Sequence, residues 1–326
     1  MKNIFVTGGG GYVGSSLIPK LLVKNYNVTV LDLFIYSKDV LKPHKNLKCI
    51  TGDIRDNNLL KEATKKIDVF IHLACISNDP SFELNPKLGK SINLDCFRPM
   101  VEICRNNNVR RFIYASSSSV YGVKNEKNVI ENMNLEPLTD YSRFKMDCEK
   151  ILKEYKSENF ITVTARPATV CGYAPRQRLD VVVNILSNLA YHKRKVKIFG
   201  GSQLRPNIHI DDMTNAYLLL IEADEKIVNG EEFNIGFENQ TVEEIALNVK
   251  KVIGDDVSLE YVPTDDNRSY HISSEKILNY LNFKPQYTVN DAINQLKNAF
   301  EKKILINTFT NHNYFNIKKM QTIKLK

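Results

Sequence analysis

The segment Thr7-Gly8-Gly9-Gly10-Gly11-Tyr12-Val13-Gly14 follows a short apolar run and opens a helical pattern over Tyr12–Lys24. Its glycines have the spacing of a turn that carries the chain from a strand into a helix against a dinucleotide. Gly8 would form the tight turn, Gly11 would let the backbone approach the diphosphate, and Gly14 would let the helix pack closely on the sheet. Free N–H groups at the start of that helix favour phosphate. The segment therefore predicts a dinucleotide-binding α/β fold.

Apolar runs alternate with helical patterns through the first half of the chain, which is typical of a parallel sheet covered by helices. The predicted strands are Asn3–Val6, Asn27–Leu31, Leu47–Ile50, Val69–Leu73, Arg111–Ala115 and Ile161–Ala165. The predicted helices between them are Tyr12–Lys24, Asn57–Lys66, Pro86–Asn106 and Tyr141–Lys156. Beyond about residue 170 the pattern loosens, with elements predicted at Val181–Tyr191, Val196–Phe199, Phe233–Ile235 and Thr241–Val252.

This order predicts an α/β protein with a Rossmann domain, a doubly wound parallel sheet, over residues 1–169. Residues 206–256 are expected to return to that domain in part. A smaller, interleaved C-terminal substrate domain is expected over residues 170–205 and 257–300.

The net charge of +8 is concentrated at one end of the chain. Six of the charges are lysines that follow Glu301, with no acidic residue among them, and the rest of the chain is close to balanced. Nucleic-acid binding would therefore rest on this tail alone, and we expect none. The recognisable fold is expected to end near Phe300, which leaves residues 301–326 as a solvated basic tail.

The pattern of cysteines and the hydropathy of the chain indicate where in the cell the protein is expected. The six cysteines are unclustered, which favours reduced thiols in the cytoplasm and no metal site. No apolar stretch is long enough for insertion into a membrane.

Asp32 closes the second predicted strand. A carboxylate at this place accepts hydrogen bonds from the hydroxyls of the adenosine ribose and repels a 2′-phosphate. No arginine follows within the next several residues. The sequence therefore predicts NAD, not NADP, as the cofactor.

Tyr141 and Lys145 lie four residues apart at the start of a predicted helix, so their side chains share one face. A nearby ammonium and a positively charged nicotinamide would both stabilise the phenolate and make Tyr141 a usable base near neutral pH. The preceding strand ends in Ala115-Ser116-Ser117-Ser118-Ser119-Val120-Tyr121-Gly122. Hydroxyls at the carboxyl end of a parallel strand face the crevice in which ligands bind.

Together with Gly52-Asp53-Ile54 and His72-Leu73-Ala74, these motifs resemble those of the extended short-chain dehydrogenases/reductases. Within that family the layout is similar to the nucleotide-sugar epimerases and dehydratases, and the resemblance extends to about Phe300. It implies an NAD-dependent enzyme that acts on a nucleotide-linked sugar. It also implies a homodimer formed through the helices predicted at Pro86–Asn106 and Tyr141–Lys156.

The resemblance implies roles for individual residues. Ser117 matches the catalytic hydroxyl, Tyr141 the base, and Lys145 the lysine that also holds the nicotinamide ribose. The implied cofactor-binding residues are Gly8, Gly11, Tyr12, Val13, Gly14, Asp32, Asp53, Ile54, Leu73, Ala74, Tyr141 and Lys145. The candidate substrate-binding residues are Ser77, Asn78, Ser117, Ser118, Arg178, Asn184, Arg205 and Arg268.

Several of these candidates have a purely structural alternative. Arg205 and Arg268 resemble the arginines that grip the nucleotide diphosphate, but they could instead pair with Asp211 or Asp266 at the surface. Arg178 and Asn184 lie in a segment similar to that of bacterial enzymes acting on activated sugars for surface polysaccharides, and they could equally cap a helix. Asn93 matches a polar position of the family, but it could equally be a structural asparagine whose hydrogen bonds are satisfied within the protein.

Two departures from the family pattern bear on the reaction. Nucleotide-sugar 4,6-dehydratases carry an Asp-Glu pair after the catalytic hydroxyl, whereas this chain has Ser118-Ser119. Hydroxyls of ordinary pKa cannot replace two carboxylates in an elimination, so dehydratase activity is not expected. In addition, Thr169 stands where the family has an asparagine, which puts one substrate hydrogen bond in question.

The expected reaction is oxidation at C4 of the sugar followed by reduction on its other face, which is a 4-epimerisation. A net 4-dehydrogenase or 4-keto reductase, for example on a GDP-heptose, would use the same residues, and the sequence does not separate the two. A non-catalytic NAD-sensing scaffold should lack part of the Ser/Tyr/Lys set, which is complete here.

Overall fold

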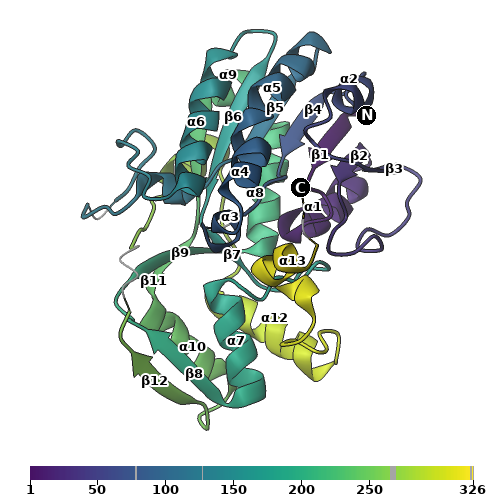
Figure 1. Ribbon diagram of the computed structural model, residues 1–326. Coiled ribbons are helices and arrows are strands. Elements are labelled where there is room, and N and C mark those ends of the chain that lie inside the picture. Colours follow the sequence, from purple (N-terminus) through teal and green to yellow (C-terminus); the bar gives the residue numbers. More distant parts are fainter. Residues whose placement is uncertain (78, 127, 265–268, 324, 326) are drawn as a thin grey trace.

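A seven-stranded parallel sheet forms the centre of the protein (Figure 1). The computed structural model describes residues 1–326 apart from 78, 127, 265–268, 324 and 326. The strands of the sheet are β1 (Asn3–Thr7), β2 (Asn27–Asp32), β3 (Leu47–Thr51), β4 (Val69–His72), β5 (Arg111–Ala115), β6 (Ile161–Pro167) and β10 (Glu231–Ile235). They lie in the order β10-β6-β5-β4-β1-β2-β3, so the chain moves outward from β1 in both directions. This arrangement confirms the predicted doubly wound α/β fold.

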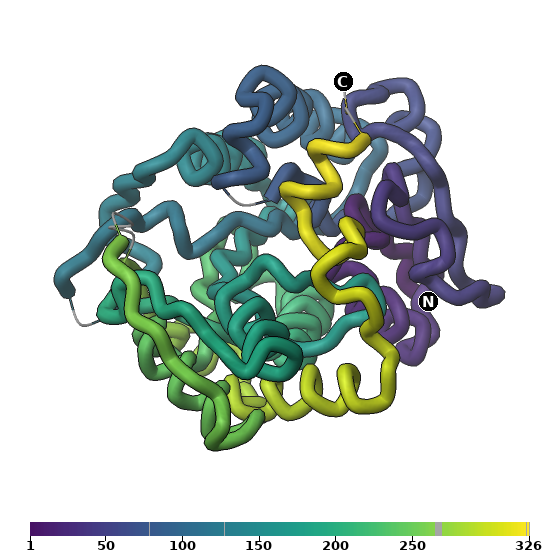
Figure 2. Tube along the Cα trace, turned by 60° about the horizontal axis from the view of Figure 1, so that its bottom comes forward, coloured from purple at the N-terminus to yellow at the C-terminus, as the bar shows by residue number. Residues whose placement is uncertain are grey.

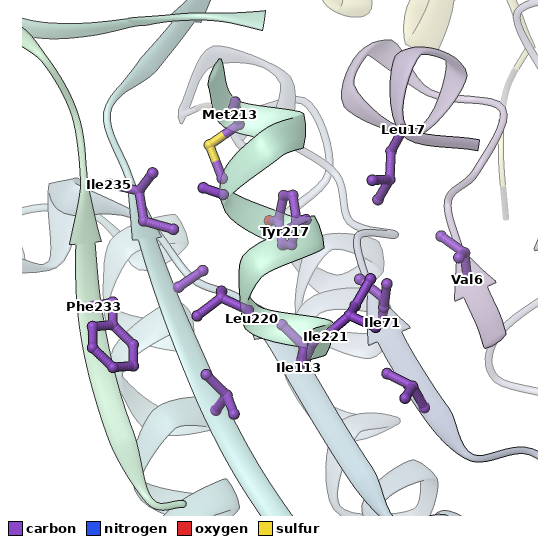
Figure 3. Packing of buried hydrophobic residues seen from close by; sticks show 14 of the residues in the cluster. Val6, Leu17, Ile71, Ile113, Met213, Tyr217, Leu220, Ile221, Phe233 and Ile235 are labelled. Atoms are coloured by element: carbon purple, nitrogen blue, oxygen red, sulfur yellow. The ribbon is translucent and has the colours of Figure 1, made fainter. Parts of the chain in front are cut away.

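Helices cover both faces of this sheet, because alternate residues of each strand point to opposite sides. On one face, α1 (Tyr12–Val23) and α8 (Ile210–Glu222) pack on the strands. Figure 3 shows Tyr217 and Leu220 of α8 facing Ile71 and Ile113 of the sheet. The helices α2 (Asn57–Ala63), α5 (Phe97–Asn106) and α6 (Asp140–Glu154) bury their apolar side chains with Phe70 on the other face.

A smaller assembly below the sheet is built mainly from the second half of the chain (Figure 1). Its three main helices, α7 (Val182–Lys193), α10 (Val242–Ile253) and α12 (Val289–Glu301), share one apolar cluster. Two small sheets accompany them, formed by β8 (Lys195–Phe199) with β12 (Ser258–Val262), and by β11 (Glu238–Thr241), β9 (Leu204–His209) and β7 (Thr169–Cys171). A capping box begins α10, since the Thr241 side chain accepts from the backbone N–H of Glu244 and the Glu244 carboxylate accepts from that of Thr241.

The remaining elements are short. They are α3 (Asp79–Glu83), α4 (Pro86–Lys90), η1 (Ser91–Asp95), η2 (Ser118–Tyr121), α9 (Glu225–Val228), α11 (Glu275–Leu281), η3 (His312–Tyr314) and α13 (Asn316–Ile323). Among the described residues, no helix is both long and apolar enough to span a membrane.

The helix predicted over Pro86–Asn106 is interrupted. Between α4 and α5 the backbone takes one wide π turn, η1, and this turn buries the side chain of Asn93. The Asn93 amide accepts from the backbone N–H of Ile76 and donates to its carbonyl, both at 2.9 Å. The extra residue in the turn therefore fixes the loop that follows β4, which a hydrophobic pattern does not reveal.

The expectation of a solvated tail after Phe300 is wrong. Leu305 and Phe315 are buried against Leu179 and Leu296, and the segment ends in a helix, α13. Figure 2 shows this segment, in yellow, crossing the molecule from α12 toward its amino-terminal half. Lysines gave the segment its charge, but its few apolar side chains decide where it lies, because they lose contact with water when they pack.

Candidate active site

A cleft opens at the carboxyl ends of the central strands, where the strand order reverses between β1 and β4. All the cofactor-binding residues expected from the sequence line it, namely Gly8, Gly11, Tyr12, Val13, Gly14, Asp32, Asp53, Ile54, Leu73, Ala74, Tyr141 and Lys145. Four of the candidate substrate residues line the same cleft, namely Ser77, Ser117, Ser118 and Arg178.

The turn between β1 and α1 has no room for side chains. Gly8 has φ +75°, and a Cβ atom there would lie 2.6 Å from the backbone nitrogen of Ala74. A Cβ atom on Gly14 would lie 2.6 Å from the carbonyl oxygen of Gly8. The backbone at this turn is therefore open to a close approach by a diphosphate, and the first N–H groups of α1 point to the same place.

Asp32 stands beside this turn at the end of β2. Its two carboxylate oxygens accept hydrogen bonds from the backbone N–H groups of Gly10 at 2.9 Å and Phe34 at 2.6 Å. Burial raises the pKa of Asp32, whereas these two donors and the positive charge of Arg176 act in the opposite direction. The neighbouring Asp53 forms an ion pair with Arg55 at 2.7 Å, and its hydrogen bonds with Arg55 hold the pKa of that carboxyl below its usual value. We call the part of the cleft around Asp32 and Asp53 the adenosine end, after the roles expected of these residues from the sequence.

Tyr141 and Lys145 occupy the first two turns of α6, which begins after Thr139, whose side chain accepts from the N–H of Ser142. Lys145 is buried and donates to the carbonyl oxygen of Ala115 at 2.7 Å. Its Nζ lies 5.8 Å from the centre of the Tyr141 ring. Burial raises the pKa of the Tyr141 phenol well above its usual range, so the phenol becomes a base only when positive charge lies beside it.

A chain of hydroxyl groups leads from Ser117 to a carboxylate. The Oγ atoms of Ser117 and Ser119 are 2.8 Å apart, and the hydroxyl of Ser142 lies 2.9 Å from that of Ser119. Thr139 lies 3.0 Å from Ser142 and donates to Asp79 at 2.5 Å. Because a carboxylate only accepts, the single Thr139 proton is directed to Asp79, whereas Ser142 donates to Ser119, and Ser119 can then donate to Ser117 and hold it in place.

His72 lies at the end of β4 below this site, but it does not serve as a base. Burial, assisted by the charge of Lys145, lowers the pKa of His72 to about 3. The neutral ring shares a 2.7 Å hydrogen bond with the hydroxyl of Thr7. It therefore supports the sheet.

The substrate side agrees only partly with the sequence-based expectations. Arg178 reaches the cleft, where its Nε donates to Asp180 at 2.6 Å and its Nη1 lies 3.4 Å from Ser77 Oγ. Asn184 does not line the cleft, because its amide accepts from the backbone N–H of Gly172 and donates to Tyr12 and Arg178. It is thus a structural residue that ties the substrate side to α1.

Of the two arginines expected to grip the nucleotide diphosphate, only Arg205 lies within the described residues. Arg205 is absent from the residues that line the cleft, and its guanidinium lies 5.6 Å from the ring centre of Tyr270, which does line it. Asn78 and Arg268 lie outside the described residues. Asp211, an expected alternative partner of these arginines, pairs with Lys20 at 3.1 Å.

Three residues that the sequence did not single out complete the cleft. Tyr36, Arg176 and Asn316 all line it. Arg176 had a weak signal, since it stands in the same polar segment as Arg178, but the sequence did not separate the two arginines. Tyr36 and Asn316 gave no signal, because single polar or aromatic residues in loops have no periodicity.

Comparison of the sequence with known protein families identifies the family of this protein. Residues 4–236 match the NAD dependent epimerase/dehydratase family. The chain belongs to this family. It is therefore an NAD-dependent enzyme of the nucleotide-sugar epimerase/dehydratase type, an extended short-chain dehydrogenase/reductase. The glycine turn and Asp32 fit that cofactor.

Relatives within the family include both epimerases and dehydratases. YtcB of Bacillus subtilis, an uncharacterized UDP-glucose epimerase, is 31% identical over 309 residues, which cover 89% of this chain and 95% of YtcB. The dTDP-D-glucose 4,6-dehydratase of Homo sapiens is 28% identical over 342 residues, covering 98% of this chain and 93% of the human protein. The structure of DesIV, a dTDP-glucose 4,6-dehydratase from Streptomyces venezuelae with NAD and TYD bound, has a TM-score of 0.83 at 21% identity over 92% of this chain and 97% of DesIV. Family membership alone therefore leaves the reaction open.

Proposed function

We propose that this enzyme is a nucleotide-sugar 4-epimerase, which oxidises C4 of the sugar and reduces it again on the other face. The observation that carries the proposal is the placement of Ser117, Tyr141 and Lys145 in one cleft with the dinucleotide turn, together with hydroxyls at the two positions after Ser117. The relatives named as UDP-glucose epimerases support the substrate class.

Tyr141 would take the proton of the C4 hydroxyl. Its high pKa, which burial raises, must fall for this step. The charge of Arg178 lowers this pKa, and the ammonium of Lys145, 5.8 Å from the ring centre, would act in the same direction. The Ala115 carbonyl holds this ammonium, so the charge stays at a fixed place during the proton transfer. Bound NAD supplies the hydride acceptor and, after the sugar has turned, the hydride donor. The same phenol would return the proton to the C4 oxygen.

Ser117 would bind the oxygen of C4 throughout the cycle. Its hydroxyl oxygen can accept from Ser119, which accepts from Ser142, so the single hydroxyl proton of Ser117 stays available for the C4 oxygen. Thr139, which donates to Asp79, caps the helix at Ser142. A hydroxyl fixed in this way needs no reorganisation when the alcohol becomes a ketone, which is the condition for electrostatic stabilisation of the developing charge. Ser119 and Asp79 are thus positioning residues, since they act through Ser117.

Loss of water from the sugar is disfavoured by the same geometry. Among the described residues that line the cleft, the acidic ones are Asp32, Asp53 and Asp79, and the first two belong to the adenosine end. Asp79 is therefore a single carboxylate near the catalytic hydroxyls, and it is bonded to Thr139. An elimination across C5 and C6 needs both an acid and a base, so we infer that the C6 hydroxyl is retained.

The test is to incubate the purified enzyme with UDP-, GDP- and dTDP-sugars and to record reduced-nicotinamide absorbance together with product NMR. A 4-epimer formed without net NADH supports the proposal. A released 4-keto sugar with stoichiometric NADH would replace it by a net 4-dehydrogenase. A 4-keto-6-deoxy product would contradict the interpretation of Ser118 and Ser119.

A further inference from the structure

The last helix of the chain crosses the mouth of the cleft. We call residues 315–323 the C-terminal strap. At its start Phe315 is buried in a cluster with Leu179, Leu296 and Phe300 on the substrate side. Met320 of the strap and Leu325, which follows the strap, pack on the opposite side of the cleft. They contact the apolar cluster that includes Phe70 of the central sheet, and both line the cleft. The strap thus connects the two sides of the cleft. Figure 2 shows the yellow segment running from α12 to the amino-terminal half of the chain.

One residue of the strap, Asn316, joins the two sides of the cleft through four hydrogen bonds. Its side-chain oxygen accepts from the Tyr36 hydroxyl at 3.0 Å and from Arg176 Nη2 at 2.5 Å. Its side-chain nitrogen donates to Ser77 at 2.7 Å, and its backbone N–H donates to Asp180 at 2.7 Å. Asn316 is only 5% exposed, so these bonds satisfy a polar side chain that would otherwise be costly to bury.

Arg176 is a buried cation that forms no direct ion pair with any described carboxylate. Its side chain lines the cleft, it is 5% exposed, and its guanidinium lies 3.5 Å from the centre of the Tyr36 ring. Among the described residues no carboxylate forms an ion pair with it, and its Nε has no hydrogen-bond partner. Burial lowers the pKa of Arg176 to about 10, which still leaves it charged at neutral pH. The charges of Asp180 and Asp32 act on the guanidinium without a direct ion pair, so its unpartnered Nε–H remains a donor for a further anion.

The surroundings of Arg176 identify the part of the cleft in which that anion would lie. The backbone N–H of Arg176 donates to Ser15 in the first turns of α1, directly after the glycine turn. Tyr36, on which the guanidinium stacks, follows Asp32 by four residues, and the charge of Arg176 acts on Asp32. Arg176 therefore stands over the adenosine end and the start of α1, where the phosphates of a dinucleotide are favoured.

We propose that Arg176, held in place by Tyr36 and by Asn316 of the C-terminal strap, binds the diphosphate of the dinucleotide cofactor and that the docked strap retains this cofactor. A planar guanidinium with a free Nε–H can donate to phosphate oxygens while Nη2 remains bonded to Asn316. The cofactor leaves only after the strap has moved away. This assignment concerns cofactor binding alone and holds whichever sugar reaction the enzyme performs.

The first experiment measures the dissociation rate of NADH from the full-length protein by its fluorescence, with excess NAD⁺ as the competitor. Arg176→Gln and Asn316→Ala should each raise the rate about tenfold or more, as expected for loss of a charge-assisted contact. Tyr36→Phe, which keeps the ring and removes one bond to Asn316, should raise it a few-fold. Thr322→Ala is the matched control, because Thr322 is exposed and its side chain bonds only to Lys319 within the same helix. Unchanged rates for Arg176→Gln and Asn316→Ala would overturn the proposal.

A second experiment separates direct phosphate binding from a general loss of structure. In Arg176→Gln the affinity for ADP should fall about tenfold or more, while the affinity for adenosine, which has no phosphate, should stay the same. Equal losses for ADP and adenosine would mean that Arg176 only shapes the cleft, and would contradict the assignment.

A third arm distinguishes the two diphosphates that the cleft could receive. UDP binding to the NADH-loaded protein should be little changed in Arg176→Gln. A loss of UDP affinity with unchanged NADH and ADP binding would assign Arg176 to the sugar nucleotide and overturn the assignment to the cofactor.

Discussion

The two ends of the cleft are built in different ways. At the catalytic end, Ser117 lies in the turn that follows β5, and Tyr141 and Lys145 lie in α6. Hydroxyl groups link Ser117 to Ser142 of the same helix. At the adenosine end, Arg176 and Tyr36 meet Asn316 across sequence separations of 140 and 280 residues and hold a buried charge. The catalytic end keeps its geometry as long as β5 and α6 pack together. The adenosine end is complete only while the strap is docked, so chemistry and cofactor retention should respond to different mutations.

The largest expected effect is at the catalytic end. Tyr141→Phe removes the phenol oxygen and leaves the ring, so the rate of the chemical step should fall about a hundredfold or more, as for loss of a general base. Nucleotide-sugar affinity and NADH dissociation should stay near those of the unmodified enzyme. Single-turnover kinetics and NADH fluorescence measure the two quantities. A comparable loss in both would show that the two ends are not separable.

The opposite pattern is expected for Phe315→Ala. Truncating a buried phenylalanine costs about 3–5 kcal/mol of stability. Here the truncation weakens the packing of the strap against Leu179, Leu296 and Phe300. NADH should dissociate tens of times faster, with the chemical step of the loaded enzyme unchanged. Amide hydrogen exchange should accelerate in α13 before it does in the central sheet. Phe309→Ala, in the same segment but outside the cleft, should leave both measurements unchanged.

A third test concerns the choice of cofactor at the adenosine end. The unmodified enzyme should bind NADH much more tightly than NADPH, because Asp32 would face the 2′-phosphate. Asp32→Ala should narrow that gap about tenfold, since the carboxylate is removed while the charge of Arg176 remains close by. Isothermal titration with NADH and NADPH gives the ratio of the two affinities. Asp39→Ala is the control, because Asp39 is an exposed carboxylate close to Asp32 in the sequence. Equal affinities in the unmodified enzyme would contradict the role of Asp32.

The smallest effect is expected from Ser119→Ala, which breaks the hydroxyl chain behind Ser117. The chemical step should slow a few-fold without a change in KM, because Ser117 keeps its place in the chain but loses its hydrogen-bonded support. Ser187→Ala removes a buried hydroxyl that bonds only to Val183 within α7, and it should have no effect on the rate. An effect on KM alone would mean that Ser119 contacts the substrate directly.

The central sheet could be predicted because each strand–helix unit is encoded locally. β4 shows this, since Val69, Phe70 and Ile71 form one apolar run that is buried on both faces. Asp32 and Tyr141 could be assigned to one cleft from the sequence alone, because the carboxyl ends of parallel strands meet at one edge. The interruption at η1 could not be predicted, since the buried bonds of Asn93 depend on a loop that is distant in sequence.

The tail illustrates what a local pattern cannot show. Phe315, Met320 and Leu325 are spaced five residues apart, which is neither a helical stripe nor a strand alternation, and lysines surround them. Their burial depends on two apolar clusters that form only in the folded protein, so the sequence alone does not show where these side chains pack. The same holds for Arg205, whose motif predicted a diphosphate contact, whereas the structure places it outside the residues that line the cleft.

Ser77 connects the two ends of the cleft, because its hydroxyl is shared by Asn316 of the strap and Arg178 of the substrate side. A sugar nucleotide that draws Arg178 to its own phosphates changes the bonding of Ser77, and with it the docking of Asn316. By thermodynamic reciprocity, the factor by which the sugar nucleotide alters the affinity for NAD equals the factor by which NAD alters the affinity for the sugar nucleotide. On the proposed assignments, the Ser77 hydroxyl would therefore couple occupancy of the substrate site to retention of the cofactor, and one coupling free energy would describe both effects.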